Sequence, residues 1–105
     1  MRPGEDRFWT LVDELREEDS RVDEGTMMGR RCARVGGEFL ALVGFRDHGM
    51  VVKLPSTRVD ELVADGTGRP FAPAGRVFRE WVSVPDPEDW PRLLREGVAF
   101  VGEAP

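Results

Sequence analysis

The chain has 105 residues, of which 40% are hydrophobic and 33% charged, and its formal net charge is −5. These values are typical of one globular domain and exclude a wholly disordered chain, so we expect a single domain over residues 1–105 with its core in about 5–101. No apolar run approaches the roughly 20 residues that span a bilayer, and the N-terminal residues lack a signal-peptide pattern. We therefore expect a cytoplasmic protein with no membrane partner.

Charge is unevenly distributed along this acidic chain. Residues 1–25 carry four basic side chains against nine carboxylates, whereas residues 26–55 carry five basic side chains against two carboxylates. The overall acidity disfavours a strong, nonspecific nucleic-acid binder, but it leaves room for a local basic face.

The first predicted element is a helix over residues 5–18, because its apolar side chains recur with helical spacing. They are Phe8, Leu11, Val12 and Leu15. The following residues, 19–25, are polar and are predicted to form a loop.

Three strands are predicted next, over residues 30–35, 38–45 and 50–54. The first turn is Gly36-Gly37, a pair that supplies the positive φ angles of a tight hairpin, and the second turn covers residues 46–49. In 38–45, strict alternation places Phe39, Ala41 and Val43 on one face and Leu40 and Leu42 on the other. Both faces are apolar, which predicts a central strand covered on both sides.

A second helix is predicted with Ser56 or Thr57 as its N-cap, where Thr57 and Asp60 resemble a capping box, and it is predicted to end at Gly66. Residues 66–75 are rich in Gly and Pro and are predicted to form a loop anchored by Phe71. A fourth strand is expected over 76–84.

The last predicted element begins with a turn at residues 87–90, capped by Asp86, and continues as a helix to about Val101. Gly97 lies within this helix and is expected where the helix approaches the sheet closely. The resulting order, α-β-β-β-α-β-α, predicts a single α+β domain in which helices pack on an antiparallel β-meander.

The best candidate site consists of Lys53, Arg79 and Trp81. Alternation places Lys53 away from Val52 and Leu54, and places Arg79 and Trp81 away from Phe78 and Val82. If the third and fourth strands are neighbours, two cations lie beside an aromatic ring, which suits phosphate contact with base stacking. Three further arginines could extend this surface: Arg31, Arg34 and Arg76. The alternative is that Trp81 is a core or interface aromatic whose arginine neighbours stack on it or pair with glutamates.

No residue pattern indicates catalysis, a metal or a cofactor. Cys32 is the only cysteine, and His48, the only histidine, is expected in a solvated turn without ligand partners at metal spacing. The carboxylates near the end of the first helix form a solvated run rather than an acid–base pair. They are Glu14, Glu17, Glu18 and Asp19. We therefore expect a non-enzymatic protein.

An ordered set of motifs covers about residues 8–101 and resembles the TfoX N-terminal-domain family, which is related to YjbR/MmcQ-like proteins. The family pattern often reads Met-Phe-Gly where this chain has Met27-Met28-Gly29. The other matching motifs are the Gly36-Gly37 hairpin, Phe39-Leu40-Ala41-Leu42-Val43, Val51-Val52-Lys53-Leu54-Pro55, Arg58-Val59-Asp60-Glu61-Leu62, Gly68-Arg69-Pro70-Phe71, Gly75-Arg76-Val77 and Glu80-Trp81-Val82-Ser83-Val84-Pro85.

This resemblance implies an α+β fold, kinship with a regulator of bacterial DNA-uptake competence, and no established catalytic residues. That regulator has a second domain to which nothing in this sequence corresponds. Two functions are therefore expected as alternatives. One is a regulatory module that binds a nucleic acid or a protein through the basic, aromatic sheet face. The other is a protein–protein adaptor or homodimer that binds no nucleic acid.

Overall fold

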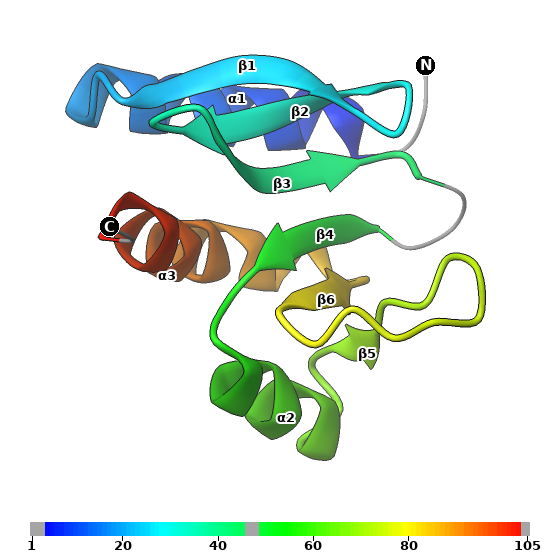
Figure 1. Cartoon of the computed structure of the whole chain (residues 1–105). Coiled ribbons are helices and arrows are strands. Elements are labelled where there is room, and N and C mark those ends of the chain that lie inside the picture. Colours follow the sequence, from blue (N-terminus) through cyan, green and yellow to red (C-terminus); the bar gives the residue numbers. More distant parts are fainter. Residues whose placement is uncertain (1–3, 46–48, 104–105) are drawn as a thin grey trace.

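The computed structural model describes residues 4–45 and 49–103, and it confirms a single compact α+β domain (Figure 1). The predicted turn at 46–49, including His48, lies largely outside the described residues. The elements, in chain order, are α1 (Glu5–Glu18), β1 (Val22–Met27), β2 (Arg30–Val35), β3 (Glu38–Val43), β4 (Met50–Lys53), α2 (Ser56–Ala64), β5 (Arg69–Pro70), β6 (Trp81–Val84), a 3₁₀ turn η1 (Pro87–Asp89) and α3 (Trp90–Gly102). In this part of the chain no helix combines the length and apolar character that a membrane crossing requires.

The sheet has the order β1-β2-β3-β4-β6-β5, and every neighbouring pair is antiparallel. Strands β2 to β4 form the predicted three-stranded meander, and β1 extends it by one strand. After β4 the chain passes through α2 and β5 before β6 pairs with β4 (Figure 1).

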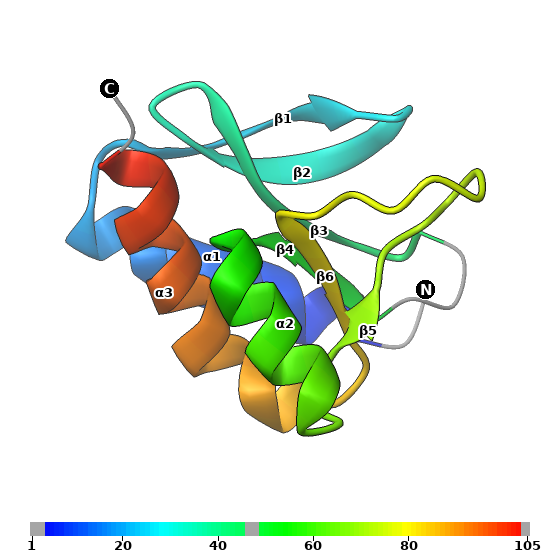
Figure 2. The same cartoon turned by 60° about the horizontal axis from the view of Figure 1, so that its bottom comes forward.

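The two faces of the sheet have different covers. The three helices gather on one face (Figure 2), where side chains such as Phe8, Leu62 and Leu94 join the sheet in the main core cluster. On the other face, part of the long β5–β6 connection packs against the sheet. A second cluster forms there from Cys32, Phe39, Leu42, Val51 and Phe71. Phe71 is fully buried, which confirms its predicted anchoring role.

A β-bulge changes the faces predicted for β3. Arg34 pairs with Phe39 and Ala33 pairs with Ala41, which leaves Leu40 as an extra residue. Leu40 and Ala41 consequently both belong to the main core, whereas Phe39 and Leu42 belong to the second cluster. The prediction of strict alternation through this strand was wrong, because the extra residue of a bulge reverses which face each following side chain occupies.

The prediction of a loop over 19–25 was also wrong, because β1 begins at Val22 and pairs with β2 along its length. β1 is an edge strand in which only Val22 is buried. Its stability comes from backbone pairing, so its composition is polar and lacks apolar alternation.

The predicted strand over 76–84 is correct only for Trp81–Val84. The preceding residues belong to the connection, where the Phe78 amide donates to the Phe71 carbonyl at 3.0 Å and the Trp81 amide donates to the Phe78 carbonyl at 3.1 Å. This segment bonds to itself, and Phe78 contacts Trp81 instead of facing away from it. The predicted loop likewise contains the two-residue strand β5.

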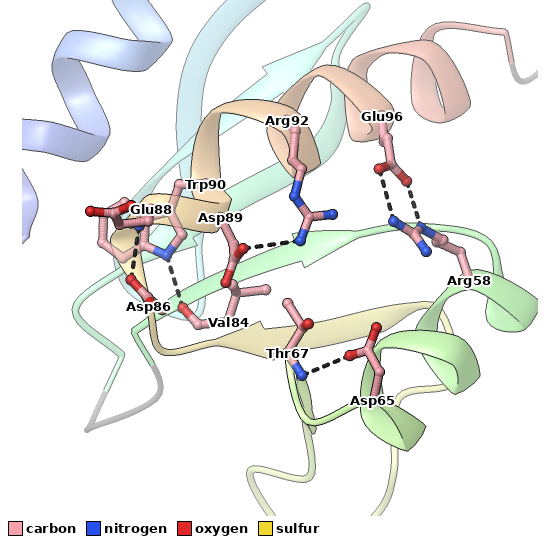
Figure 3. Close-up of polar contacts among 10 residues, drawn as sticks. All are labelled: Arg58, Asp65, Thr67, Val84, Asp86, Glu88, Asp89, Trp90, Arg92 and Glu96. Carbon is pink, nitrogen blue, oxygen red and sulfur yellow. Dashed lines mark hydrogen bonds and ion pairs between the residues drawn. The ribbon is translucent and has the colours of Figure 1, made fainter.

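Helix α2 ends near Gly66 as predicted, with a φ of 86° at that glycine. Its predicted capping box is wrong, because the N-cap residue is Pro55 and no side chain caps this end. Helix α3 follows the prediction more closely. The Glu88 amide donates to the Asp86 carboxylate at 3.0 Å (Figure 3), and a Cβ atom at Gly97 would lie 2.8 Å from Leu40 Cδ1.

Candidate functional site

Lys53 and Trp81 lie directly opposite each other in the β4–β6 pairing, at the end of β4 and the start of β6. Arg79 precedes β6 by two residues and completes a shallow hollow of about 440 Å³. We call this the basic hollow, and its lining residues are Lys53, Ser56, Phe78, Arg79, Glu80 and Trp81. Three of the six residues proposed from sequence thus come together here.

The basic hollow holds two cations and one carboxylate. Within the described residues, neither Lys53 nor Arg79 forms an ion pair, and Glu80 lines the hollow without pairing with either of them. Most arginines elsewhere in the fold are paired with carboxylates. They are Arg16, Arg21, Arg31, Arg58, Arg92 and Arg95.

The N-terminus of α2 adds to this positive potential. Its first N–H groups have no acceptor within the helix, and Pro55, the N-cap residue, has no side-chain oxygen to offer them. Ser56, the first residue of the helix, lines the basic hollow. The positive end of the helix dipole therefore lies beside the two cations.

Trp81 belongs partly to the core. Its indole stacks on Phe39 with ring centroids 4.2 Å apart, lies nearly parallel to Phe71 at 5.6 Å, and contacts the tilted ring of Phe78 at 5.0 Å. The side chain is half-buried in the second cluster. This packing favours a core role for most of the ring, while the remaining exposed part borders the basic hollow.

Arg31, another of the predicted residues, lies on the opposite face of the sheet. Its guanidinium lies 4.1 Å from the centre of the Trp9 ring on α1, and its Nε donates to Glu24 at 2.6 Å. The ion pair lowers the pKa of Glu24 through the Arg31 hydrogen bond. Arg31 is thus engaged in holding α1 against the β1–β2 hairpin.

Arg34 shares a face with Phe39 but does not reach the basic hollow. Its guanidinium lies over Gly25, where a Cβ atom would collide with it, and Nη2 donates to the Thr26 carbonyl at 3.0 Å. Arg76 is exposed on the β5–β6 connection and does not line the basic hollow.

A larger apolar groove of about 530 Å³ adjoins the basic hollow. We call it the α2 groove, because α2 forms one wall and the β5–β6 connection forms the other. It is lined by Ser56, Val59, Asp60, Val63, Ala64, Pro70, Val77, Phe78, Arg79 and Trp81. Four of these also line the basic hollow, so the two cavities form one continuous site with a charged end and an apolar end. The shared residues are Ser56, Phe78, Arg79 and Trp81.

A bidentate ion pair fixes the wall formed by α2. Arg58 donates from Nε and Nη2 to the two carboxylate oxygens of Glu96 on α3, at 2.8 and 3.1 Å (Figure 3). Arg58 Nη1 also donates to Glu61 at 3.1 Å. These hydrogen bonds raise the pKa of Arg58.

The sequence analysis missed Ser56, Asp60 and Phe78 as site residues. Ser56 and Asp60 are four residues apart at the start of α2, so they share one helix face just after Lys53. That spacing was a usable signal. Phe78 was assigned to the wrong face because the strand was predicted to begin too early.

The described residues include no group of three or more metal-ligating side chains, and Cys32 is a buried free thiol. Comparison of the chain with protein-family models, with curated proteins and with solved structures finds no significant match.

Proposed function

We propose that the chain is a non-enzymatic, regulatory binding module of the TfoX N-terminal type, and that its basic hollow binds the phosphate backbone of a single-stranded nucleic acid. The observation that carries this proposal is the placement of Lys53 and Arg79, both without ion pairs in the described structure, beside an uncapped helix N-terminus. Cations and helix N-termini are the groups that contact phosphate oxygens.

The aromatic neighbours favour a single strand over a duplex. Phe78 and Trp81 are half-buried at the edge of the basic hollow, and proteins that bind single strands combine cations with aromatic side chains. The net charge of −5 works against electrostatic wrapping of a duplex. A short contact on one or two phosphates suits a local basic site.

Kinship with the TfoX N-terminal domain is part of the proposal, and support for it comes from the ordered motifs and the α+β fold they imply. A cytoplasmic location is part of the same proposal, and the buried thiol of Cys32 is compatible with it.

The test is salt-dependent binding of a fluorescein-labelled dT8 oligonucleotide, measured by fluorescence anisotropy. For two phosphate contacts, the slope of log affinity against log salt is expected to be about −1.4, since each contact on a single strand contributes about 0.7. Lys53→Ala and Arg79→Ala are each expected to make this slope shallower. Arg7→Ala, which removes an exposed arginine from α1, is the matched control and should leave it unchanged. Absence of binding at low salt rejects the proposal.

A second candidate is a protein–protein adaptor or a homodimer. The exposed Val77, with 56% of its surface accessible, favours this alternative because it borders the apolar α2 groove. A chain that binds no oligonucleotide but dimerises in analytical ultracentrifugation, and loses dimerisation in Val77→Asp, would have this function instead.

A further inference from the structure

We infer that the α2 groove accepts one unstacked base of the bound strand and that Asp60 makes guanine the preferred base. This inference rests on the proposed function, because the basic hollow holds the neighbouring phosphate.

The size and lining of the α2 groove suit a nucleobase. Its volume of about 530 Å³ lies within the roughly 300–1,000 Å³ usual for small-molecule sites. The walls consist largely of apolar side chains, including Val59, Val63 and Val77, with few polar groups among them. Sequence-specific proteins commonly splay a base out of a single strand and hold it against such walls.

Continuity with the basic hollow provides the connection between base and phosphate. Ser56, Phe78, Arg79 and Trp81 line both cavities. A nucleotide is itself a flat ring joined to an anionic group, so its two parts match the apolar and the charged ends of the site. Arg79 lies where the two ends meet, and its five N–H donors can serve a phosphate and a base acceptor together.

The polar groups of the α2 groove determine which base it prefers. Asp60 is an acceptor-only carboxylate that forms no ion pair or hydrogen bond within the described residues. Guanine presents two adjacent donors, N1–H and the N2 amino group, which a carboxylate accepts together. Ser56 and Arg79 supply donors for the guanine O6 acceptor. Thymine has only one N–H on its pairing edge, and cytosine and adenine have only an amino group.

The experiment compares four dT8-based oligonucleotides that carry dG, dA, dC or dT at one central position, again by anisotropy at low salt. We expect the wild-type protein to bind the dG oligonucleotide about fivefold or more tightly than dT8, which corresponds to roughly 1 kcal/mol. Asp60→Asn should reduce this ratio to near one. Glu17→Gln removes an equal charge from an exposed position on α1 and should keep the ratio, which separates base reading from overall charge.

A second pair of variants tests occupancy of the α2 groove without relying on Asp60. Ala64 and Ala99 are both exposed helical alanines, but only Ala64 lines the groove. Ala64→Phe should abolish the preference for dG, whereas Ala99→Phe should retain it. Thermal melting of each variant establishes that it is folded.

The outcomes separate this inference from the proposed function. Equal affinity for all four oligonucleotides, together with losses in Lys53→Ala and Arg79→Ala, overturns the base subsite and leaves phosphate binding intact. A dG preference that survives both Asp60→Asn and Ala64→Phe also overturns the subsite. If no oligonucleotide binds, the subsite and the proposed function fall together.

Discussion

The indole of Trp81 stacks on the phenyl ring of Phe39, with centroids 4.2 Å apart and planes 15° from parallel. The two residues come from β6 and β3, which are separated in the sheet by β4. The contact therefore crosses β4 on the face of the sheet that carries the second cluster, and Trp81 also lines the basic hollow. Trp81 both stabilises the fold and borders the candidate site, so its two roles must be measured separately.

Replacement of Trp81 tests the strength of this packing. Trp81→Ala is expected to lower the free energy of unfolding by about 3 kcal/mol, near the lower limit for a large aromatic because the ring is only half-buried. Trp81→Phe keeps a stacked ring and should cost about 1 kcal/mol. Urea denaturation measures both. A near-neutral Trp81→Ala would show that the ring contributes little to the core.

Gly97→Ala is expected to destabilise the protein by about 1–3 kcal/mol, as overpacking does. The added Cβ atom would lie 2.8 Å from Leu40 Cδ1, 3.0 Å from Val52 Cγ2 and 3.2 Å from the Lys53 carbonyl oxygen. The sign of the change in unfolding free energy is diagnostic, because replacing glycine by alanine in an unhindered helix stabilises the protein by about 0.5–1 kcal/mol. A stabilised variant in thermal or urea unfolding would contradict the close approach of α3 to the sheet.

Arg58→Lys should cost about 1 kcal/mol, because lysine cannot reproduce the bidentate contact with Glu96. The effect is modest because both side chains remain partly exposed, at 29% and 37%. Arg95→Lys is the control, since the Arg95–Glu18 pair is more exposed. Equal costs in urea denaturation would indicate that the link between α2 and α3 has no special role.

Stability is expected to decrease as the pH falls below about 4.5. Hydrogen bonds from the Arg21 side chain, and then from its backbone amide, lower the pKa of Asp19 from 3.8 to about 2. Arg95 lowers the pKa of Glu18, and hydrogen bonds from Thr67 lower the pKa of Asp65. Such groups stabilise the fold above their unfolded-state pKa, and this contribution is lost as the pH falls through the folded-state pKa.

Asp19→Asn should therefore flatten the acid limb of the profile of urea midpoint against pH between about 4 and 2 and leave the profile above pH 5 parallel to the wild type. An unchanged acid limb would mean that the Asp19–Arg21 interaction does not persist in solution.

The uncapped N-terminus of α2 leads to a prediction in which stability and oligonucleotide affinity change in opposite directions. Pro55→Ser supplies an N-cap acceptor and should be about 1 kcal/mol more stable than Pro55→Ala in urea denaturation. If phosphate occupies the helix N–H groups, Pro55→Ser should bind dT8 more weakly than Pro55→Ala. Equal affinities would exclude these N–H groups as phosphate ligands.

Local signals in the sequence were sufficient for much of the fold. Gly36 and Gly37 have φ angles of 59° and 85°, as a glycine-pair turn requires, and Asp86 caps the turn before α3. Helical periodicity located α1 with its boundaries. These features depend on residues close together in the chain, so propensity and spacing determine them.

The site was only partly predictable. Alternation predicted that Lys53 and Trp81 share a face if their strands are neighbours, and the structure makes the strands neighbours and places the two residues opposite each other. Arg31 and Arg34 were expected on the same surface, but Trp9 and Glu24 engage Arg31 on the opposite face, and Gly25 allows Arg34 to turn toward β1. Those partners are distant along the chain, and no local pattern identifies them.

The sequence by itself determined the α+β class, the meander and most of the helix ends, because short-range periodicity and turn chemistry encode them. Only the tertiary structure decided that Val22–Met27 is a strand and that Leu40 forms a bulge. It also decided that α2 and the β5–β6 connection enclose a groove that adjoins the basic hollow. The physical reason is that edge pairing, bulges and cavities depend on contacts between segments that are distant along the chain. The composition and spacing of a short or polar segment do not identify those contacts.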